Sequence, residues 1–131
     1  SFNTESSVSN ITTEQENIFN ILSKAFTNLL KELNCDSNPY YCFQLGRTSP
    51  KYCYKTHQDE VDKIFTFVYH ISEKGVGTRL HLTEKDPYVK TTKWIRNGGQ
   101  GFFRDEHTWH SYDTLDFDDI RQCIVMILYK K

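Results

Sequence analysis

The chain has no excess of charge of one sign, since 16 Lys and Arg residues stand against 17 Asp and Glu residues. Proteins that coat nucleic acid or lie on anionic membranes usually carry a strong positive charge, so this balance supports neither role. No stretch approaches the ~20 apolar residues that cross a bilayer, and the N-terminal residues lack the basic start and apolar run of a signal peptide. We therefore expect a cytoplasmic protein with no membrane partner and no nucleic-acid signature.

The sequence is also poor in paired cysteines. It has four, Cys35, Cys42, Cys53 and Cys123, and no two of them form a Cys-x-x-Cys motif. This spacing argues against a zinc site built from cysteine, and the low density argues against a small scaffold held by disulfides. A reducing compartment is the simpler inference.

The sequence shows no alternation of strands with helices, no internal repeat and no low-complexity tract. It is instead rich in aromatic residues, which make up 15% of its 131 residues. Aromatic side chains suit strands better than a helix bundle, and a chain of this length is the size of one domain. We expect a single, mainly β domain over residues 1–131.

One helix is predicted near the N-terminus, over residues 12–34. The Thr12–Glu16 segment has the pattern of a capping box, and Asn34 is a suitable end. The apolar residues that follow recur at steps of three and four, as expected of a helix that packs against a sheet: Ile18, Ile21, Leu22, Ala25, Phe26, Leu29, Leu30 and Leu33. The turn formers of residues 35–50 predict a loop or short strands.

Short β-rich runs fill residues 51–131, and their close spacing predicts a jelly roll, a double-stranded β-helix of two facing antiparallel sheets. The predicted strands are Tyr52–His57, Ile64–Ser72, Thr78–Thr83, Tyr88–Ile95, Gly101–Asp105, Thr108–Leu115 and Ile120–Lys130. In the last of these, residues 123–129 are continuously apolar. We expect one of its faces to line the interior and the other to pack under the helix.

Two histidines and an aspartate have the composition of a metal site. His57 and Asp59 are two residues apart, so on an extended segment both side chains point to the same face. His110 follows far along the chain, where a later strand can return beside the first. Two imidazoles and one carboxylate are a ligand set for ferrous iron that leaves three coordination positions open. Arg121 lies one strand further on, where it can bring a cation beside the metal.

Residues 54–131 resemble the catalytic core of the Fe(II)/2-oxoglutarate-dependent dioxygenase superfamily, and in particular its prolyl-hydroxylase-like members. That core has a His-x-Asp motif on an early strand and a late histidine followed by a basic residue. Four further segments resemble the family's pattern in order along the chain: Lys63–Tyr69, Gly77–Leu80, Gly99–Phe103 and Trp109–Tyr112.

The resemblance implies that His57, Asp59 and His110 bind iron, and that Arg121 binds the far carboxylate of 2-oxoglutarate. Tyr69 is a further candidate for binding the cofactor, although a packing role is equally typical of such a tyrosine. The expected activity is hydroxylation of an unidentified small molecule or protein side chain by O2, with release of succinate and CO2. Family members that halogenate have a small residue in place of Asp59. At Cys123 the family has a serine or threonine, so the expected hydroxyl is missing.

Two other functions remain open on the sequence. One is a jelly-roll binding module with a non-catalytic metal, and the other is a cupin-type metalloenzyme that does not use 2-oxoglutarate. Neither needs a cation at Arg121, so this residue discriminates between them and the dioxygenase. Of the other histidines, His107 competes with His110 as a ligand, His81 is a candidate for the substrate pocket, and His70 is expected to face away if Tyr69 faces the site.

Overall fold

The computed structural model describes residues 2–3, 13–34 and 40–130. These residues form a mainly β fold with one helix near the N-terminus, as the sequence predicts. The helix is α1 (Thr13–Glu32), and the strands are β1 (Phe2–Asn3), β2 (Tyr40–Thr48), β3 (Cys53–His57), β4 (Lys63–His70), β5 (Arg79–His81), β6 (Tyr88–Thr91), β7 (Gly99–Phe103), β8 (Trp109–Asp113) and β9 (Arg121–Tyr129). All seven strands predicted after residue 51 are present, with ends that differ by a few residues.

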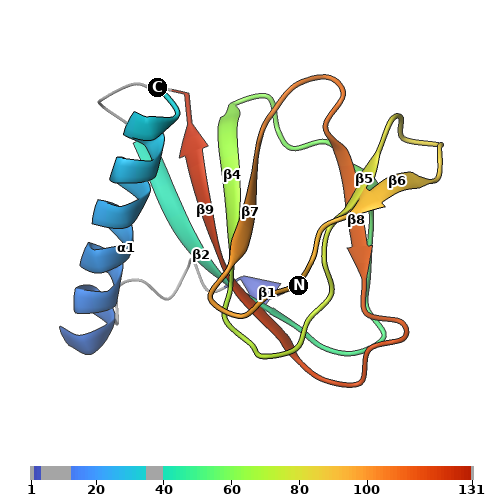
Figure 1. Ribbon diagram of the computed structural model, residues 1–131, viewed down its shortest axis with the longest axis horizontal. Coiled ribbons are helices and arrows are strands. Elements are labelled where there is room, and N and C mark those ends of the chain that lie inside the picture. The colour runs from blue at the N-terminus through green and yellow to red at the C-terminus, as the bar shows by residue number, and fades with distance from the viewer. Residues whose placement is uncertain (1, 4–12, 35–39, 131) are drawn as a thin grey trace.

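The strands form two antiparallel sheets. The larger has the order β1-β2-β9-β4-β7, and the smaller has the order β3-β8-β5-β6. Figure 1 shows the larger sheet between α1 on one side and the smaller sheet on the other. The pairs are nested, because β2 pairs with β9, β3 with β8, β4 with β7 and β5 with β6. Strands that are far apart in the sequence, such as β2 and β9, therefore lie side by side.

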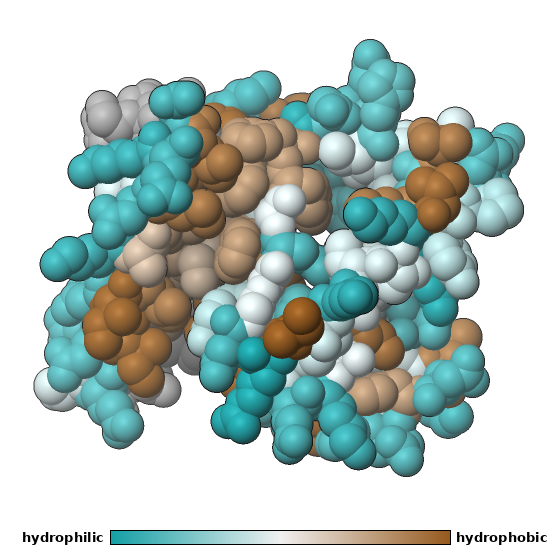
Figure 2. Space-filling model, viewed as in Figure 1, coloured by the Kyte–Doolittle hydropathy of each residue, from teal (hydrophilic) through white to brown (hydrophobic). Residues whose placement is uncertain are grey.

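Helix α1 packs on the outer face of the larger sheet through a narrower stripe than predicted. Phe26 and Leu30 are each 1% exposed, and the Phe26 ring lies 6.0 Å from that of Phe43 on β2 and 6.3 Å from that of Phe65 on β4. Ile18 and Ile21, which we expected in this stripe, are exposed. Apolar surface accordingly remains visible over α1 and the strands beside it in Figure 2.

Strand β9 is covered on both faces, as its continuous apolar sequence predicts. Met126 and Leu128 belong to the core beneath α1. Val125 and Ile127 point to the opposite side, where they line a cavity between the two sheets. This alternation places every second residue of β9 on the cavity side, including Arg121 and Cys123.

The prediction of a loop or short strands in residues 35–50 was wrong for the part that the structure describes, since β2 is a nine-residue strand. It pairs with β9 along its whole length, so the sheets begin before residue 51. The reason lies partly at Gly46, which is opposite Cys123. A Cβ at Gly46 would lie 2.8 Å from the Cys123 Sγ atom, so glycine serves close packing of the strands here and not a turn. Residues 35–39 lie outside the described residues.

Candidate metal centre

The two sheet-forming segments expected to carry metal ligands meet in the smaller sheet. His57 ends β3 and is the cross-strand partner of His110 on β8, and a β-bulge precedes it. Asp59 follows in the turn to β4. The Nε2 atoms of His57 and His110 lie 3.8 Å and 3.4 Å from Oδ1 of Asp59. One nitrogen from each imidazole and one carboxylate oxygen lie within 4.8 Å of one another, so these three residues could hold a metal ion.

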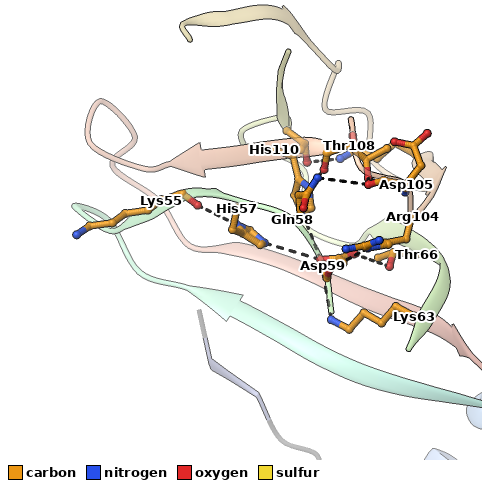
Figure 3. A network of polar contacts seen from close by, with 12 residues as sticks. Lys55, His57, Gln58, Asp59, Lys63, Thr66, Arg104, Asp105, Thr108 and His110 are labelled. Carbon is orange, nitrogen blue, oxygen red and sulfur yellow. Dashed lines mark hydrogen bonds and ion pairs between the residues drawn. The ribbon is translucent and has the colours of Figure 1, made fainter. Parts of the chain in front are cut away.

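Both histidines are held in the orientation that a metal ligand needs. The Nδ1 atom of His57 lies 2.8 Å from the Lys55 carbonyl oxygen, and that of His110 lies 3.0 Å from the Thr108 carbonyl oxygen. A carbonyl oxygen only accepts hydrogen bonds, so each Nδ1 carries a proton and donates it. In a neutral ring the Nε2 lone pair is then free for the metal, as in many histidine sites. Figure 3 shows these contacts around Asp59.

Asp59 is held from the other side of the carboxylate. The Thr66 hydroxyl on β4 donates a 2.9 Å hydrogen bond to Oδ2, and Lys63 Nζ lies 3.9 Å from Oδ1. Burial raises the pKa of Asp59, but the hydrogen bond and charge that His110 supplies in its protonated form, together with Lys63 and Thr66, outweigh burial and lower the pKa to about 2. Asp59 is therefore an anion at neutral pH.

The surroundings keep His57 neutral. Burial lowers the pKa of His57, and repulsion from Lys63, and from His110 whenever that ring is protonated, lowers it further, against the opposing effects of the Lys55 carbonyl and Asp59. A metal ligand must be an unprotonated imidazole, so this shift favours metal binding at neutral pH.

The triad opens into a cavity of about 460 Å³ between the two sheets. A volume of this size is typical of a small-molecule site. The lining residues come from both sheets and from the turn after β3: Gln44, Leu45, Gly46, Tyr54, His57, Asp59, Glu60, Lys63, Thr66, Val68, Thr78, Phe102, His110, Tyr112, Arg121, Cys123, Val125, Ile127 and Tyr129. The structure thus brings Arg121 into the same cavity as the triad.

Arg121 is a buried cation with no carboxylate partner among the described residues. Arg121 is 4% exposed. Its Nε donates a hydrogen bond to the Val76 carbonyl at 3.1 Å, and its Nη1 lies 3.5 Å from the Cys123 Sγ atom. The rings of Trp94 and Tyr112 lie 4.9 Å and 4.2 Å from its Cζ atom. Burying an unpaired charge is strongly unfavourable, so an anionic ligand is the chemistry that this position favours.

Cys123 faces the same cavity beside Arg121. Burial raises the pKa of its thiol, and the neighbouring guanidinium only partly offsets that effect. The thiol therefore stays neutral at pH 7 and adds no negative charge to the cavity.

Tyr69 does not lie where the sequence placed it. On β4 the odd-numbered residues Phe65, Phe67 and Tyr69 contact the core beneath α1, and the even-numbered Thr66 and Val68 line the cavity. The Tyr69 hydroxyl donates to Asn97 at 3.0 Å on the exposed side. Tyr69 is thus separated from the cavity by the sheet and is not positioned to bind a ligand there.

The structure also places the remaining histidines, His107 in the turn before β8 and the other two on strands. His107 is highly exposed and pairs with Glu106 at 3.5 Å, which leaves His110 as the ligand candidate. His81 lies 2.7 Å from the Ser111 hydroxyl and lines a different hollow, on the outer side of the smaller sheet. His70 is 1% exposed and stacks on Trp94 at 4.0 Å, on the interior side of β4. We expected His70 to face away only if Tyr69 faced the site, and the two neighbours do point to opposite sides, with Tyr69 on the side of α1.

Two tyrosines of the site escaped the sequence reasoning. Tyr54 and Tyr112 line the cavity as a stacked pair with ring centres 5.4 Å apart, and the Tyr54 ring lies 4.4 Å from that of His57. Burial and the charge of Asp59 raise the pKa of Tyr54, so its phenol is neutral. A signal existed, because Tyr112 follows His110 by two residues and must share its face.

No protein-family model matches the chain, and no curated protein matches it significantly. No helix among the described residues has the length and apolar character needed to cross a membrane.

Proposed function

We propose that the protein is an Fe(II)- and 2-oxoglutarate-dependent oxygenase of the prolyl-hydroxylase-like type, which hydroxylates a small molecule or a protein side chain. The observation that carries the proposal is the combination, in one cavity, of the His57, Asp59 and His110 triad with a buried Arg121 that has no carboxylate partner in the described part of the chain. Triad and cation are the two binding sites that a metal-chelating dicarboxylate requires. A cupin-type enzyme or a binding module gives no reason for Arg121.

The strand order supports the finer assignment of the fold. Four nested antiparallel pairs, distributed over two facing sheets of which one ends in the small β1, are the arrangement expected of a jelly roll. In this arrangement β3 and β8 are neighbours, which is what the two histidine ligands need. We therefore propose the double-stranded β-helix as the fold.

Different residues of the cavity would bind the metal and the cosubstrate. His57, Asp59 and His110 would hold the iron, and the carbonyls of Lys55 and Thr108 keep the two rings in the ligating tautomer. Bound iron and 2-oxoglutarate would supply the oxidising chemistry, with O2 consumed and succinate and CO2 released. Arg121 would pair with the far carboxylate through parallel charge-assisted hydrogen bonds, and Trp94 and Tyr112 hold the guanidinium in place.

The proposal is tested by adding Fe(II) and 2-oxoglutarate without oxygen and recording the visible charge-transfer band. We expect the band in the wild-type protein and in Arg79→Ala, a matched control because Arg79 pairs with Asp113 on the outer side of the smaller sheet. In Arg121→Ala, saturation should require far more 2-oxoglutarate. Absence of the band in the wild type, or an unchanged titration in Arg121→Ala, would contradict the proposal.

The substrate would then be sought through succinate release. Candidate peptides, nucleotides and small metabolites are added to the iron-loaded protein, and Asp59→Ala serves as the inactive reference. A true substrate raises the rate of succinate release in the wild type only.

A further inference from the structure

The residue next to Arg121 on its own face of β9 carries no hydroxyl group. Arg121 is accompanied on the same face of β9 by Cys123, whose thiol is a weak hydrogen-bond donor. The Sγ atom already accepts from Arg121 Nη1 at 3.5 Å, and Gly46 leaves it just enough room. A carboxylate bound by Arg121 would therefore receive no strong hydrogen bond from position 123.

The phenol of Tyr112 also lies against the guanidinium. Tyr112 lines the cavity from β8, and its ring centre lies 4.2 Å from the Arg121 Cζ atom. Its ring is held by stacking on Tyr54 at 5.4 Å and by a tilted contact with Tyr52 at 6.2 Å. The ring of Tyr112 is therefore fixed beside the cation before any ligand binds.

A second hydroxyl orients that phenol. Thr48 is 1% exposed and is the cross-strand neighbour of Arg121 on β2. Its Oγ1 lies 3.1 Å from the Tyr112 hydroxyl oxygen, and this is its only side-chain hydrogen bond to the described residues. When Thr48 donates to the phenol oxygen, the hydrogen of Tyr112 is left free to be donated to a ligand.

We propose that Tyr112, oriented by Thr48, donates to the far carboxylate of 2-oxoglutarate the hydroxyl hydrogen bond that Cys123 does not supply. The inference rests on the proposed function and names a binding residue beyond the triad and Arg121. It also explains why cysteine is tolerated next to the buried arginine. The guanidinium would supply the charge and the phenol the hydroxyl donor, whereas the thiol accepts a hydrogen bond from Arg121 and donates no strong one to the ligand.

The test measures equilibrium binding by calorimetry, with anaerobic Fe(II)-loaded protein. The ligands are 2-oxoglutarate and 2-oxopentanoate, which chelates in the same way but has a methyl group in place of the far carboxylate. Tyr112→Phe removes the hydroxyl and keeps the ring. We expect it to weaken 2-oxoglutarate binding about ten-fold or more and to leave 2-oxopentanoate binding unchanged. Thr48→Val should weaken 2-oxoglutarate binding in the same direction.

A rescue variant makes the test specific. Adding Cys123→Ser to Tyr112→Phe returns a hydroxyl to the surroundings of Arg121, now at position 123, and should recover most of the lost affinity. An unchanged dissociation constant in Tyr112→Phe, equal weakening of both ligands or a failure of the rescue would overturn this inference and leave the proposed function standing. A wild-type protein that binds 2-oxoglutarate no more tightly than 2-oxopentanoate would overturn both.

Discussion

Thr66→Val should lower metal affinity although Thr66 is not a ligand. Its hydroxyl holds Oδ2 of Asp59 at 2.9 Å, which leaves Oδ1 turned towards the two histidine Nε2 atoms. Valine has nearly the same shape and suits a strand, so the change removes one hydrogen bond and little else. Partners that orient a metal ligand in this way typically contribute 10–100-fold to affinity. We expect a loss in that range, about 1.4–2.8 kcal/mol.

The assay is a titration with Co(II), whose visible absorption reports the ligand set, in competition with a chelator of known affinity. Thr27→Val is the matched control, because the Thr27 hydroxyl donates to the Ser23 carbonyl within α1 and lies outside the cavity. Thr66→Val with wild-type Co(II) affinity would refute the reasoning that Thr66 positions the carboxylate. Equal losses in both variants would mean that general destabilisation, and not the orientation of Asp59, sets the affinity.

Three further predictions concern the stability of the metal-free protein, measured by urea unfolding. Phe26→Ala should cost about 3–5 kcal/mol because it empties the core between α1 and the larger sheet, whereas Ile21→Ala, at a side chain 69% exposed, should change stability by less than about 0.5 kcal/mol. Gly77→Ala should destabilise by about 3 kcal/mol, because the new Cβ would overlap the Thr92 carbonyl; wild-type stability would exclude that close approach. Folding lowers the pKa of Asp59 from 3.8 to about 2, so its carboxylate should add about 2 kcal/mol to the free energy of unfolding above pH 4 and lose this contribution as the pH falls towards 2. The difference in free energy of unfolding between wild type and Asp59→Asn should therefore narrow over that range. A gap that is constant with pH would contradict this linkage.

Local patterns predicted the parts of the fold that depend on local residues. The helix follows from apolar spacing, and β9 follows from a continuous apolar run that only a strand covered on both faces explains. The candidate ligands could be named for the same reason, since residues two apart on an extended segment, such as His57 and Asp59, point to the same face, and His110 lies on a separate strand. What these patterns do not contain is the depth of each side chain, and Ile21 shows this by lying exposed within a regular apolar stripe.

The errors arose where two faces of a strand compete. On β4, aromatic residues and small polar residues alternate, and both faces are covered, so hydropathy alone does not say which face lines the cavity. The interior proved to hold Thr66 and His70, and Tyr69 lies with the aromatic residues beneath α1. In β2, Gly46 was read as a turn signal, whereas it relieves a contact with Cys123 that only the strand pairing creates.

The nested strand pairing has a consequence for how the protein assembles. Because β3 pairs with β8, in which His110 lies 53 positions after its partner His57, closing this pair fixes a long loop and should be a slow step in folding. A metal ion bound by His57 and His110 would cross-link the two ends of that loop, since it binds only after both strands have paired. At a metal concentration one thousand times the dissociation constant, metal binding would stabilise the native state by about 4 kcal/mol. Only molecules in which β3 and β8 have paired would bind the ion, so metal occupancy would also report on completed folding.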